Sequence, residues 1–493
     1  MNQLTVFWFR KDLRIHDNIA LYKASSSKNP VAIYIYDPEI IEEEDFSSIH
    51  LELTNDSIEE LSKLFLSQMS LLNVYKAKAV SVLNEINKKY GIKSLVTNHE
   101  VGNYKTLMRD RKISEYCNIN RINWTQFQTN GVVKGLKNRD SWSSRWNTQM
   151  RTEVISAPDL SKFKKLRGDV LIHNSASLGL KTIKYDKTIK GGENNALSQL
   201  YSFLNDRGKF YTKRISSPMA SFNSCSRLSS FISQGNISIR QIVRATSNRQ
   251  KELRENNVKN GWLRSLNSFS SRLRWHCHFV QKLEMQPDLE FTNMVRTFDV
   301  IRNNFNSEYF EKWKLGNVGF PMVDACIRSL KKNGWINFRM RAMIVSFASY
   351  NLWLDWRKTS KFLSQYFIDY EPGIHYNQFQ MQSGVTGINA IRIYNPVKQQ
   401  EDHDPNGVFV KKWVPELRGV PNEYLRYPHL MSKAMQHKTG CVINKDYPEP
   451  IVDLKKTSLQ AKKKIYDIKS SVITKVQSQE AFLKHGSRRK RNI

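Results

Sequence analysis

The chain has 493 residues, of which 40% are apolar and 25% are charged. This balance is typical of a globular protein and excludes a disordered or fibrous chain, and the length allows two or more domains. Arg10 and Lys11 interrupt the first apolar run, so no signal peptide is expected. The longest uncharged apolar stretch, residues 342–354, is too short to cross a bilayer. We expect a soluble protein without membrane partners, located in the cytoplasm or, in a eukaryote, in the nucleus or an organelle.

Net charge is the strongest signal in the composition. The 77 Lys and Arg residues exceed the 45 Asp and Glu residues by 32, and the pI is about 9.8. Such an excess favours a polyanion such as DNA as the partner. The alternative is a lysine-rich composition without functional meaning. Residues 455–493 contribute 12 of the basic residues and only two acidic ones, Asp467 and Glu480.

The five cysteines lie far apart along the chain and form no CxxC pair. This pattern argues against a zinc site, an iron–sulfur cluster or a disulfide framework. We therefore expect no bound metal, and a reducing compartment.

The first 130 residues alternate between patterns typical of strands and of helices. Residues 19–24 predict a short helix, and residues 57–90 carry one longer helical pattern. Buried parallel strands are predicted at three short apolar runs, residues 3–9, 30–36 and 95–100. The alternation predicts a doubly wound α/β domain with a parallel sheet over residues 1–130. Ligands of such sheets bind at the carboxyl ends of the strands, which fall at Arg10–Asp12, Asp37 and His99–Glu100.

The rest of the chain divides by pattern into three segments. Residues 131–195 have few long apolar runs and are expected to connect two domains. Residues 196–450 predict a large all-helical domain, because apolar residues recur every three or four positions, as at Leu263, Leu266, Phe269 and Leu273. Residues 451–493 predict a basic C-terminal tail. One amphipathic helix is expected there, with a single apolar face made of Ile465, Ile468, Val472 and Val476, before the basic sequence RRKR at 488–491.

Segments along nearly the whole chain resemble, in order, sequence blocks of the photolyase and cryptochrome family. They are VFWFRKDLRIHDNIAL (6–21), NHEVGNYKTLMRD (98–110), SCSRLSSFISQGNIS (224–238), GFPMVDACIRSL (319–330), GWINFRMRAMIVSF (334–347), LDWR (354–357), RIYNP (392–396), KKWVPEL (411–417) and HGSRRKR (485–491). The resemblance implies that the N-terminal domain is an α/β antenna domain and that the helical part is an all-α FAD-binding domain. It also implies a second, antenna chromophore of the folate or deazaflavin type.

The family's FAD-binding positions can be carried over residue by residue. They fall on Tyr211, Ser226, Arg227, Leu228, Ser229, His276, Arg341, Asp369, Glu371 and His375. The resemblance places the SCSRLS segment at the FAD phosphates and ribose, and hydroxyls and N–H groups near a helix start suit an anion. Taken alone, without the neighbouring blocks, that segment is better interpreted as a helix N-cap. Arg341 matches an arginine beside the flavin and Asp369 an acid at its polar edge, while Glu371 replaces a usual aspartate.

Four positions depart from the family pattern. The residue that faces the reactive flavin nitrogen is His375, and because a histidine titrates near neutral pH, the protonation chemistry of the flavin is expected to differ from that of the family. The usual acidic partner of the flavin-side arginine aligns with Asn351, which predicts that Arg341 lacks that salt bridge. In the family, a relay of three tryptophans serves the photoreduction of the flavin. Here its middle position is Trp356, but the position nearest the flavin is Phe379 and the outer one falls at Asn303. Other aromatic residues could replace the relay, namely Trp353, Tyr350 and Tyr376.

On the substrate side, the family turns a pyrimidine dimer out of the DNA duplex into a pocket with flat walls. Trp275 matches the wall tryptophan and Met381 a second wall position, although a core tryptophan on a helix is the alternative for Trp275. Arg272 replaces the glutamate that often contacts the dimer. Phe338 and Ala342 stand where (6-4) enzymes have two histidines, which disfavours that activity.

Three functions remain open at this point. The first is a monomeric, light-driven lyase that repairs UV-damaged, duplex or single-stranded DNA by electron transfer from reduced FAD. Its catalytic residues are expected to be Trp275, Met381, Arg341, His375 and Trp356. The second is a cryptochrome-type blue-light photoreceptor without repair activity. The third is a nucleic-acid binder that kept the fold without the photochemistry.

Overall fold

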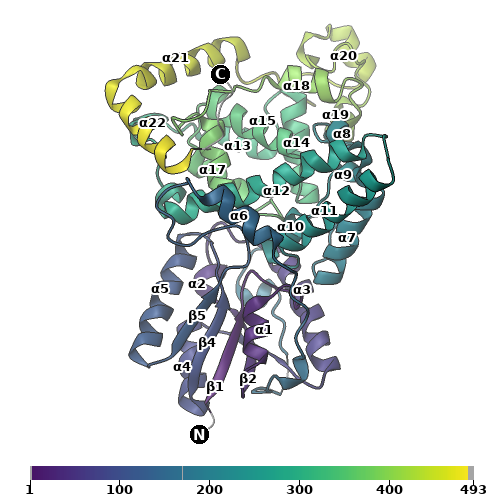
Figure 1. Ribbon diagram of the computed structural model, residues 1–493. Helices are drawn as coiled ribbons and strands as arrows, with labels where there is room; N and C mark the ends of the chain where they lie inside the picture. The colour runs from purple at the N-terminus through teal and green to yellow at the C-terminus, as the bar shows by residue number, and fades with distance from the viewer. Residues whose placement is uncertain (1–2, 169, 487–493) are drawn as a thin grey trace.

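The computed structural model describes residues 3–168 and 170–486, in which a helical domain is stacked on an α/β domain (Figure 1). One sheet of five parallel strands, in the order β3-β2-β1-β4-β5, forms the centre of the α/β domain. Its elements are β1 (Leu4–Phe9), α1 (Ile19–Ser25), β2 (Pro30–Tyr36), α2 (Pro38–Ile41), α3 (Ser48–Ser67), β3 (Leu72–Lys76), α4 (Ala79–Tyr90), β4 (Ile92–Asn98), α5 (Tyr104–Ile119) and β5 (Asn123–Phe127). The predicted doubly wound α/β domain is confirmed.

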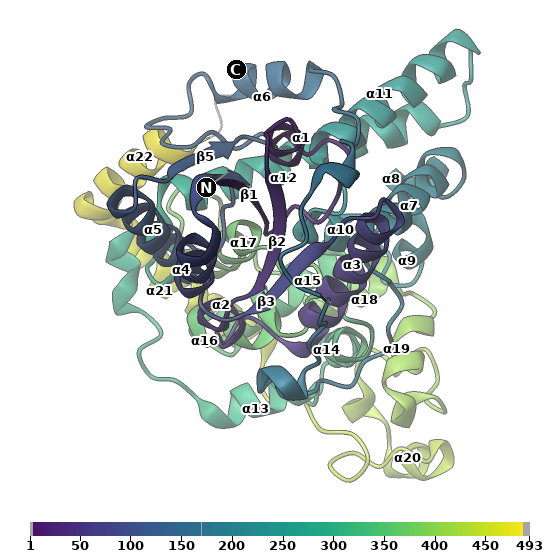
Figure 2. The same ribbon diagram turned by 90° about the horizontal axis from the view of Figure 1, so that it is seen from below.

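Strand β1 shows why both faces of the sheet carry helices. Successive side chains of a strand point to opposite faces. Phe7 and Phe9 join the apolar core with α1 and α3, whereas Val6 and Trp8 join the core with α4 and α5. Figure 2 shows the sheet from below with helices on both sides of it. A strand that is buried on both faces reads as the continuous apolar run seen in the sequence.

The single helical pattern expected over residues 57–90 is wrong. The structure has the end of α3 there, then strand β3, then α4. The five residues of β3 (LNVYK) are mostly buried and pair in parallel with β2. A strand this short leaves no alternation of its own between two amphipathic helices, so the helical period ran across it.

The helical domain, as described, consists of α6 (Trp142–Arg151), α7 (Glu193–Asn205), α8 (Tyr211–Arg214), α9 (Ser221–Ser224), α10 (Ser229–Gln234), α11 (Ile239–Glu255), α12 (Trp262–Met285), α13 (Ser307–Leu315), α14 (Pro321–Asn333), α15 (Phe338–Ser346), α16 (Trp356–Ser364), α17 (Pro372–Ser383), α18 (Pro396–His403), α19 (Val408–Trp413), α20 (Lys433–Thr439), α21 (Leu454–Ser470) and α22 (Val472–His485). A π-helical turn, Phe347–Asn351, follows α15. Helix α6 lies within the predicted connecting region, yet its Trp142 and Trp146 pack against Cys277 and Val280 of α12. That part of the connection therefore belongs to the helical core. No helix in the described part of the chain is long and apolar enough to cross a membrane.

The tail contains two helices where one was expected. Ser471 has extended backbone angles, and its side chain accepts a hydrogen bond from the Thr474 N–H at the start of α22. Ile465 is buried and Ile468 packs on the core, but Val472 and Val476 are 75% and 53% exposed. The N-cap at Ser471 redirects the chain, so the predicted continuous apolar face is wrong. The basic sequence at 488–491 lies outside the described residues.

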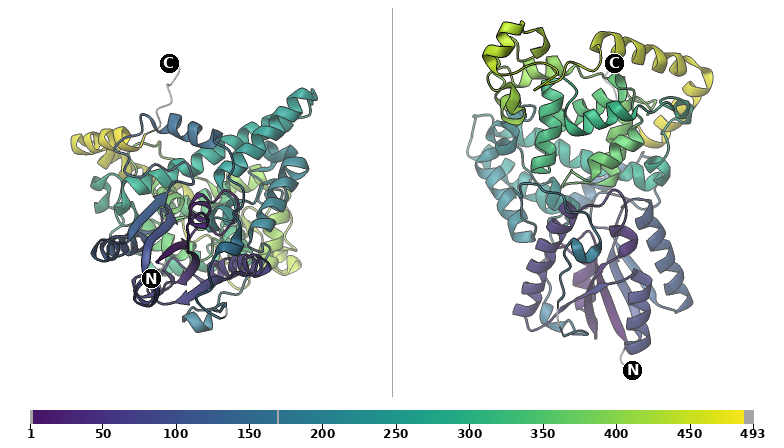
Figure 3. Two further views of the ribbon diagram at one scale, coloured as in Figure 1. Left: turned by 60° about the horizontal axis from the view of Figure 1, so that its bottom comes forward. Right: turned by 180° about the vertical axis from the view of Figure 1, so that it is seen from behind.

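The two domains meet at the carboxyl ends of the strands (Figure 3). From β1 the chain moves outward to β2 and β3, then crosses back to β4 and β5, so β1 and β4 flank the topological switch point. The turn after α10 approaches the end of β1 closely: Gly235 adopts φ +72°, and a Cβ there would lie 2.1 Å from the Lys11 carbonyl oxygen. Only glycine permits this contact between the domains.

Candidate functional site

Arg227 occupies the short loop between α9 and α10 and carries a buried, unpaired charge. Its backbone is left-handed (φ 56°), and its guanidinium lies 4.2 Å from the Trp335 ring and 5.1 Å from the Phe222 ring. The side chain is 8% exposed, and its Nε and one terminal nitrogen find no hydrogen-bond partner in the described part of the chain. Burial lowers the pKa of Arg227 to about 10, which leaves the group charged at neutral pH. A buried cation of this kind requires an anion, and a diphosphate suits it.

Arg341 and Asp369 form a bidentate ion pair, with N–O distances of 2.9 and 3.0 Å. Arg341 therefore has no salt bridge at position 351, as expected, but it has one with Asp369. Asn351, which aligned with the usual acid, is buried elsewhere and donates to the hydroxyls of Thr457 and Ser458. Burial opposes the ionisation of Asp369, but Arg341 and a hydrogen bond with Ser229 outweigh it and hold the pKa of Asp369 below its usual value. The pair therefore links α15 to the loop before α17 as two fixed charges.

Six other buried polar atoms on or beside the helices that surround this pair also lack partners among the described residues. They belong to Ser230, Arg272, His276, Asn337, Asn377 and Gln378. These residues lie on or beside α10, α12, α15 and α17, and α17 packs against both α12 and α15. Buried polar groups are normally hydrogen-bonded, so this concentration indicates the binding site of a large polar ligand. FAD, with its diphosphate, ribityl chain and flavin edge, fits such a set of donors and acceptors.

The remaining predicted FAD residues lie around the same site. Tyr211 and Leu228 are buried in the core that also holds Phe203 and Phe269. Ser226 and Ser229 are partly buried, and the Ser226 carbonyl accepts from the side chains of Gln199 and Arg207. Burial lowers the pKa of His276 to about 4, so its ring is neutral at physiological pH. The structure thus brings the predicted residues of α10, α12 and α17 together.

His375 does not titrate near neutral pH, contrary to the expectation from its residue type. It is 7% exposed and lies among the rings of Phe367, Tyr370, Tyr376 and Phe379. Its Nε2–H donates to the Ser360 carbonyl oxygen at 3.0 Å. Burial lowers the pKa of His375 to about 3, because the aromatic cluster offers no solvation to an imidazolium.

Trp275 is 47% exposed, so the alternative of a core tryptophan is wrong. The Arg272 guanidinium, one helical turn earlier on α12, lies 4.2 Å from the centre of the Trp275 ring. Phe338 at the start of α15 is also exposed, and Met381 on α17 is half-buried. The site therefore carries an exposed aromatic face with a cation beside it, an arrangement suited to a nucleic-acid base and its phosphate.

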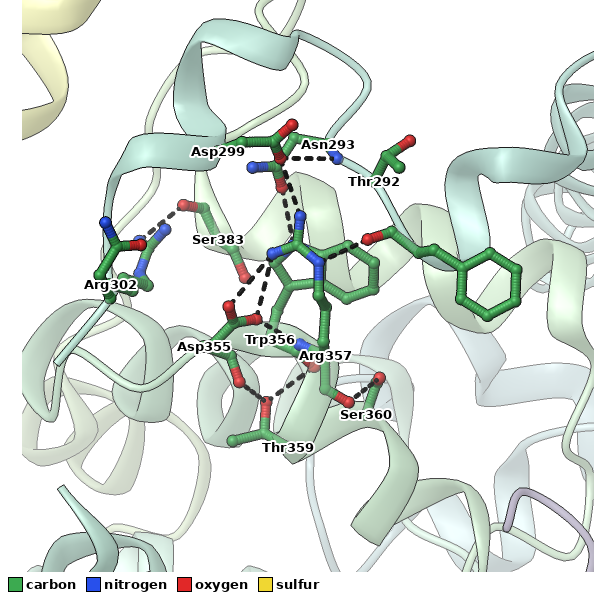
Figure 4. Close-up of polar contacts among 12 residues, drawn as sticks. Thr292, Asn293, Asp299, Arg302, Asp355, Trp356, Arg357, Thr359, Ser360 and Ser383 are labelled. Carbon is green, nitrogen blue, oxygen red and sulfur yellow. Dashed lines mark hydrogen bonds and ion pairs between the residues drawn. The ribbon is translucent and has the colours of Figure 1, made fainter. Parts of the chain in front are cut away.

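Trp356 is buried, and its indole N–H donates to the Asn293 side-chain oxygen at 2.7 Å (Figure 4). The Arg357 guanidinium lies 4.9 Å from the Trp356 ring and pairs with Asp299 and Asp355. Asn303, at the outer relay position, is an exposed residue that donates to the Val300 carbonyl oxygen.

A cavity of about 120 Å³ lies between the domains at the switch point. Of the predicted strand ends, Arg10–Asp12 and His99–Glu100 line it, whereas Asp37 instead caps α2 through the Glu39 N–H. Glu371, His276 and Tyr370 line it from the helical domain, and Asp45 lines it from the α/β domain. The sequence did not single out Tyr370 or Asp45, because no periodicity marks them. Burial raises the pKa of Glu371 to about 8, against the attraction of Lys11.

Comparisons with known proteins agree with this geometry. Residues 5–139 match the family model for DNA photolyase, and residues 269–467 match that for the FAD-binding domain of DNA photolyase. The deoxyribodipyrimidine photo-lyase of Alkalihalophilus pseudofirmus is 25% identical, over 93% of this chain and 97% of its own. The cryptochrome DASH of a Synechocystis species is 26% identical, over 93% of this chain and 96% of its own. The crystal structure of a Synechocystis cryptochrome superimposes with a TM-score of 0.83 at 22% identity, covering 94% of this chain and 99% of the other. The chain belongs to the photolyase and cryptochrome family.

Proposed function

We propose that this protein is a light-driven DNA lyase that binds FAD and splits pyrimidine dimers in UV-damaged DNA. The observation that carries the proposal is the exposed Trp275 ring, with Arg272 against it, on the same helix as His276, whose buried Nδ1 finds no hydrogen-bond partner among the described residues. A lesion stacked on Trp275 would lie beside the cofactor rather than remote from it.

Each group of residues has a separate part in this mechanism. Arg227, with Ser226 and Ser229, would hold the diphosphate by charge and hydrogen bonds. Arg341 and Asp369 would fix the polar edge of the flavin, and the Arg341 cation favours an anionic reduced ring. When bound, reduced FAD supplies the electron for ring splitting under blue or near-UV light.

The lesion side would depend on shape and stacking. Trp275 and Met381 would form the walls for a flipped dimer, whose weak stacking in the duplex lowers the cost of turning it out. Arg272, which stands where an acid is common, would contact a phosphate or a base edge. His375 stays neutral and would exclude water from the flavin rather than donate a proton from a charged ring.

The interdomain cavity supports a second proposal for the same protein, a light-harvesting chromophore of the folate or deazaflavin type at the switch point. The residues that would meet it are polar and come from both domains, with Lys11 and Glu100 on the sheet side. At about 120 Å³ the cavity is smaller than usual ligand pockets, so such a chromophore would extend beyond it.

A blue-light photoreceptor without repair activity is the second candidate. Arg272 in place of an acid, Phe379 in the relay and relatives named cryptochrome DASH favour it. The two functions differ in one measurable outcome, which is the loss of dimers under light.

Repair of an oligonucleotide with one cyclobutane dimer, measured in light and in darkness, tests the proposal. Heat should first release free FAD from the purified protein. Trp275→Ala should lower lesion affinity about 5- to 150-fold, from about 1–3 kcal/mol of stacking per base, while FAD stays bound. Tyr427→Ala, which removes a similarly exposed ring, serves as the control. FAD binding with no dimer loss in light, and equal affinity for damaged and intact DNA, would establish the photoreceptor instead.

A further inference from the structure

Two tyrosines beside the flavin-facing residue converge on one carboxylate. The Tyr370 hydroxyl donates to Asp45 Oδ2 at 2.5 Å, and the Tyr376 hydroxyl lies 3.3 Å from the same oxygen. The two hydroxyls are 3.2 Å apart. Asp45 is 6% exposed and comes from the α/β domain, whereas both tyrosines belong to the helical domain. Its other hydrogen bonds come from the Asn103 amide, so no cation neutralises it at hydrogen-bond distance in the described part of the chain.

The rings of this pair continue toward the cofactor site. The centroid of the His375 ring lies 5.0 Å from that of Tyr370 and 5.5 Å from that of Tyr376. Because His375 occupies the flavin-facing position, both tyrosines stand one residue away from the proposed flavin. The Trp356 ring also meets this pair, with 6.4 Å between its centroid and that of the Tyr376 ring.

Trp356 is a poor terminal donor in these surroundings. Its indole N–H is held by an amide oxygen, which is not a base, and the ring is 1% exposed (Figure 4). The Arg357 cation over the ring disfavours a positive charge on it. An oxidised Trp356 could not release its proton to the amide oxygen, and the nearby Arg357 cation would raise the free energy of its radical cation. Phe379, at the relay position nearest the flavin, is harder still to oxidise. The usual relay is therefore blocked at Phe379 and at Trp356.

We propose that Tyr370 and Tyr376, with Asp45 as proton acceptor, form the electron donor that reduces the flavin in light. The inference rests on the proposed FAD site. An electron leaves the phenol ring for the photoexcited flavin, and the phenolic proton moves to the Asp45 carboxylate, which leaves a neutral tyrosyl radical and a neutral acid. Burial raises the pKa of Tyr370, so its oxidation in the folded protein must be coupled to loss of that proton.

The tyrosyl radical is then reduced by a molecule that enters the interdomain cavity, which both Tyr370 and Asp45 line. A small thiol is the reductant: it gives one electron to the radical and its own proton to solvent, while Asp45 returns the first proton to the phenolate oxygen. Two oxidised thiols couple to a disulfide. Electrons therefore enter through the domain interface rather than at Asn303 on the surface.

The test measures the photoreduction of bound FAD with a thiol, together with the EPR spectrum of the protein radical trapped by freezing under light. Wild type should give a tyrosyl radical and a solvent isotope effect on photoreduction. Tyr370→Phe with Tyr376→Phe should remove the radical signal and slow photoreduction at least about tenfold, equivalent to about 1.4 kcal/mol in the barrier. Asp45→Asn should also slow it and abolish the isotope effect.

Two controls keep the outcomes distinct. Tyr447→Phe removes the hydroxyl of another buried tyrosine that donates to a carboxylate, that of Asp324, and should change neither the radical signal nor the rate. Trp356→Phe discriminates between the two routes: it would slow photoreduction through the usual relay, whereas a tyrosine donor predicts a rate close to that of wild type. The double variant, once its FAD is reduced chemically, should repair dimers as wild type does. If chemically reduced wild type repairs no dimers, the proposed function is overturned but the donor assignment is not. A tyrosyl radical that persists in the double variant, unchanged photoreduction, or a tryptophan radical lost in Trp356→Phe would overturn the donor assignment.

Discussion

Glu371 and Asp369 are two carboxyl groups in one short segment, and their surroundings drive them to opposite states. Asp369 faces Arg341 and keeps its charge, whereas burial outweighs the attraction of Lys11 and raises the pKa of Glu371 to about 8. The resemblance assigned both acids to the FAD site, but the sequence could not predict their protonation states, because these depend on which side chain lies opposite each carboxyl group. The same holds for His375, whose ordinary pKa gave the wrong expectation.

Substitution of Glu371 tests this assignment through the pH dependence of stability. Its pKa rises from 4.5 in the unfolded chain to about 8 in the folded protein, so the unfolded chain releases the proton first as the pH increases. The stabilisation is complete below pH 4.5 and is lost as the pH rises to about 8, by at most about 1.4 kcal/mol per pH unit.

Glu371→Gln should remove this slope, because an amide of the same shape cannot ionise. Urea unfolding midpoints at several pH values between 4.5 and 8 provide the measurement. Glu59→Gln, at an exposed residue of α3, should keep the wild-type slope. Equal slopes in wild type and Glu371→Gln would mean that Glu371 is ionised in the folded state.

At the scale of elements, the sequence predicted the strands and helices that have a clear apolar pattern. It missed the features that depend on a single strand pairing or a single helix cap. Strands β1, β2 and β4 and the helices near 19–24 and 262–273 follow from apolar patterns. Strand β3 and the break at Ser471 depend on pairing and capping, and neither changes the local pattern enough to be seen. The loop before α10 was located by resemblance alone. Its defining feature, an arginine held in a left-handed conformation between two aromatic rings, has no sequence period.

That loop yields a prediction about cofactor affinity. If Arg227 meets the FAD diphosphate, Arg227→Ala should weaken FAD binding about 10- to 150-fold, from about 1.5–3 kcal/mol for a charge-assisted hydrogen bond. The affinity is measured by the quenching of FAD fluorescence on titration of the flavin-free protein. Arg264→Ala removes an exposed arginine from α12 and should leave the affinity unchanged. An Arg227→Ala protein that keeps wild-type FAD affinity would place the diphosphate elsewhere.

On the scale of the whole molecule, the excess of 32 positive charges is distributed unevenly. Helices α21 and α22 carry eight lysines, none of which forms an ion pair with another described residue: Lys455, Lys456, Lys462, Lys463, Lys464, Lys469, Lys475 and Lys484. The end of α22 contacts the residue that follows α12, through His485 and Gln286 at 2.8 Å. The basic tail therefore adjoins the C-terminal end of α12, the helix that bears Trp275. If the protein binds DNA as proposed, these lysines would extend the contact to neighbouring phosphates.

The salt dependence of DNA binding separates this role from a lysine-rich composition without function. Each phosphate contact on duplex DNA contributes about 0.9 to the slope of log affinity against log salt concentration. Replacing Lys456, Lys462 and Lys463 by Gln should therefore reduce the slope by up to about 2.7, with little change in the lesion preference set at Trp275. The matched control replaces Lys63, Lys251 and Lys312, which already pair with glutamates on their own helices. It removes the same charge but should leave the slope nearly unchanged, because those lysines are neutralised within the protein. Fluorescence anisotropy of a labelled duplex across a salt series provides the slopes, and circular dichroism checks that α21 stays helical. Equal slopes in all three proteins would show that the tail does not contact DNA. If the affinity of wild type does not change with salt, the positive charge is a feature of composition without a role in DNA binding.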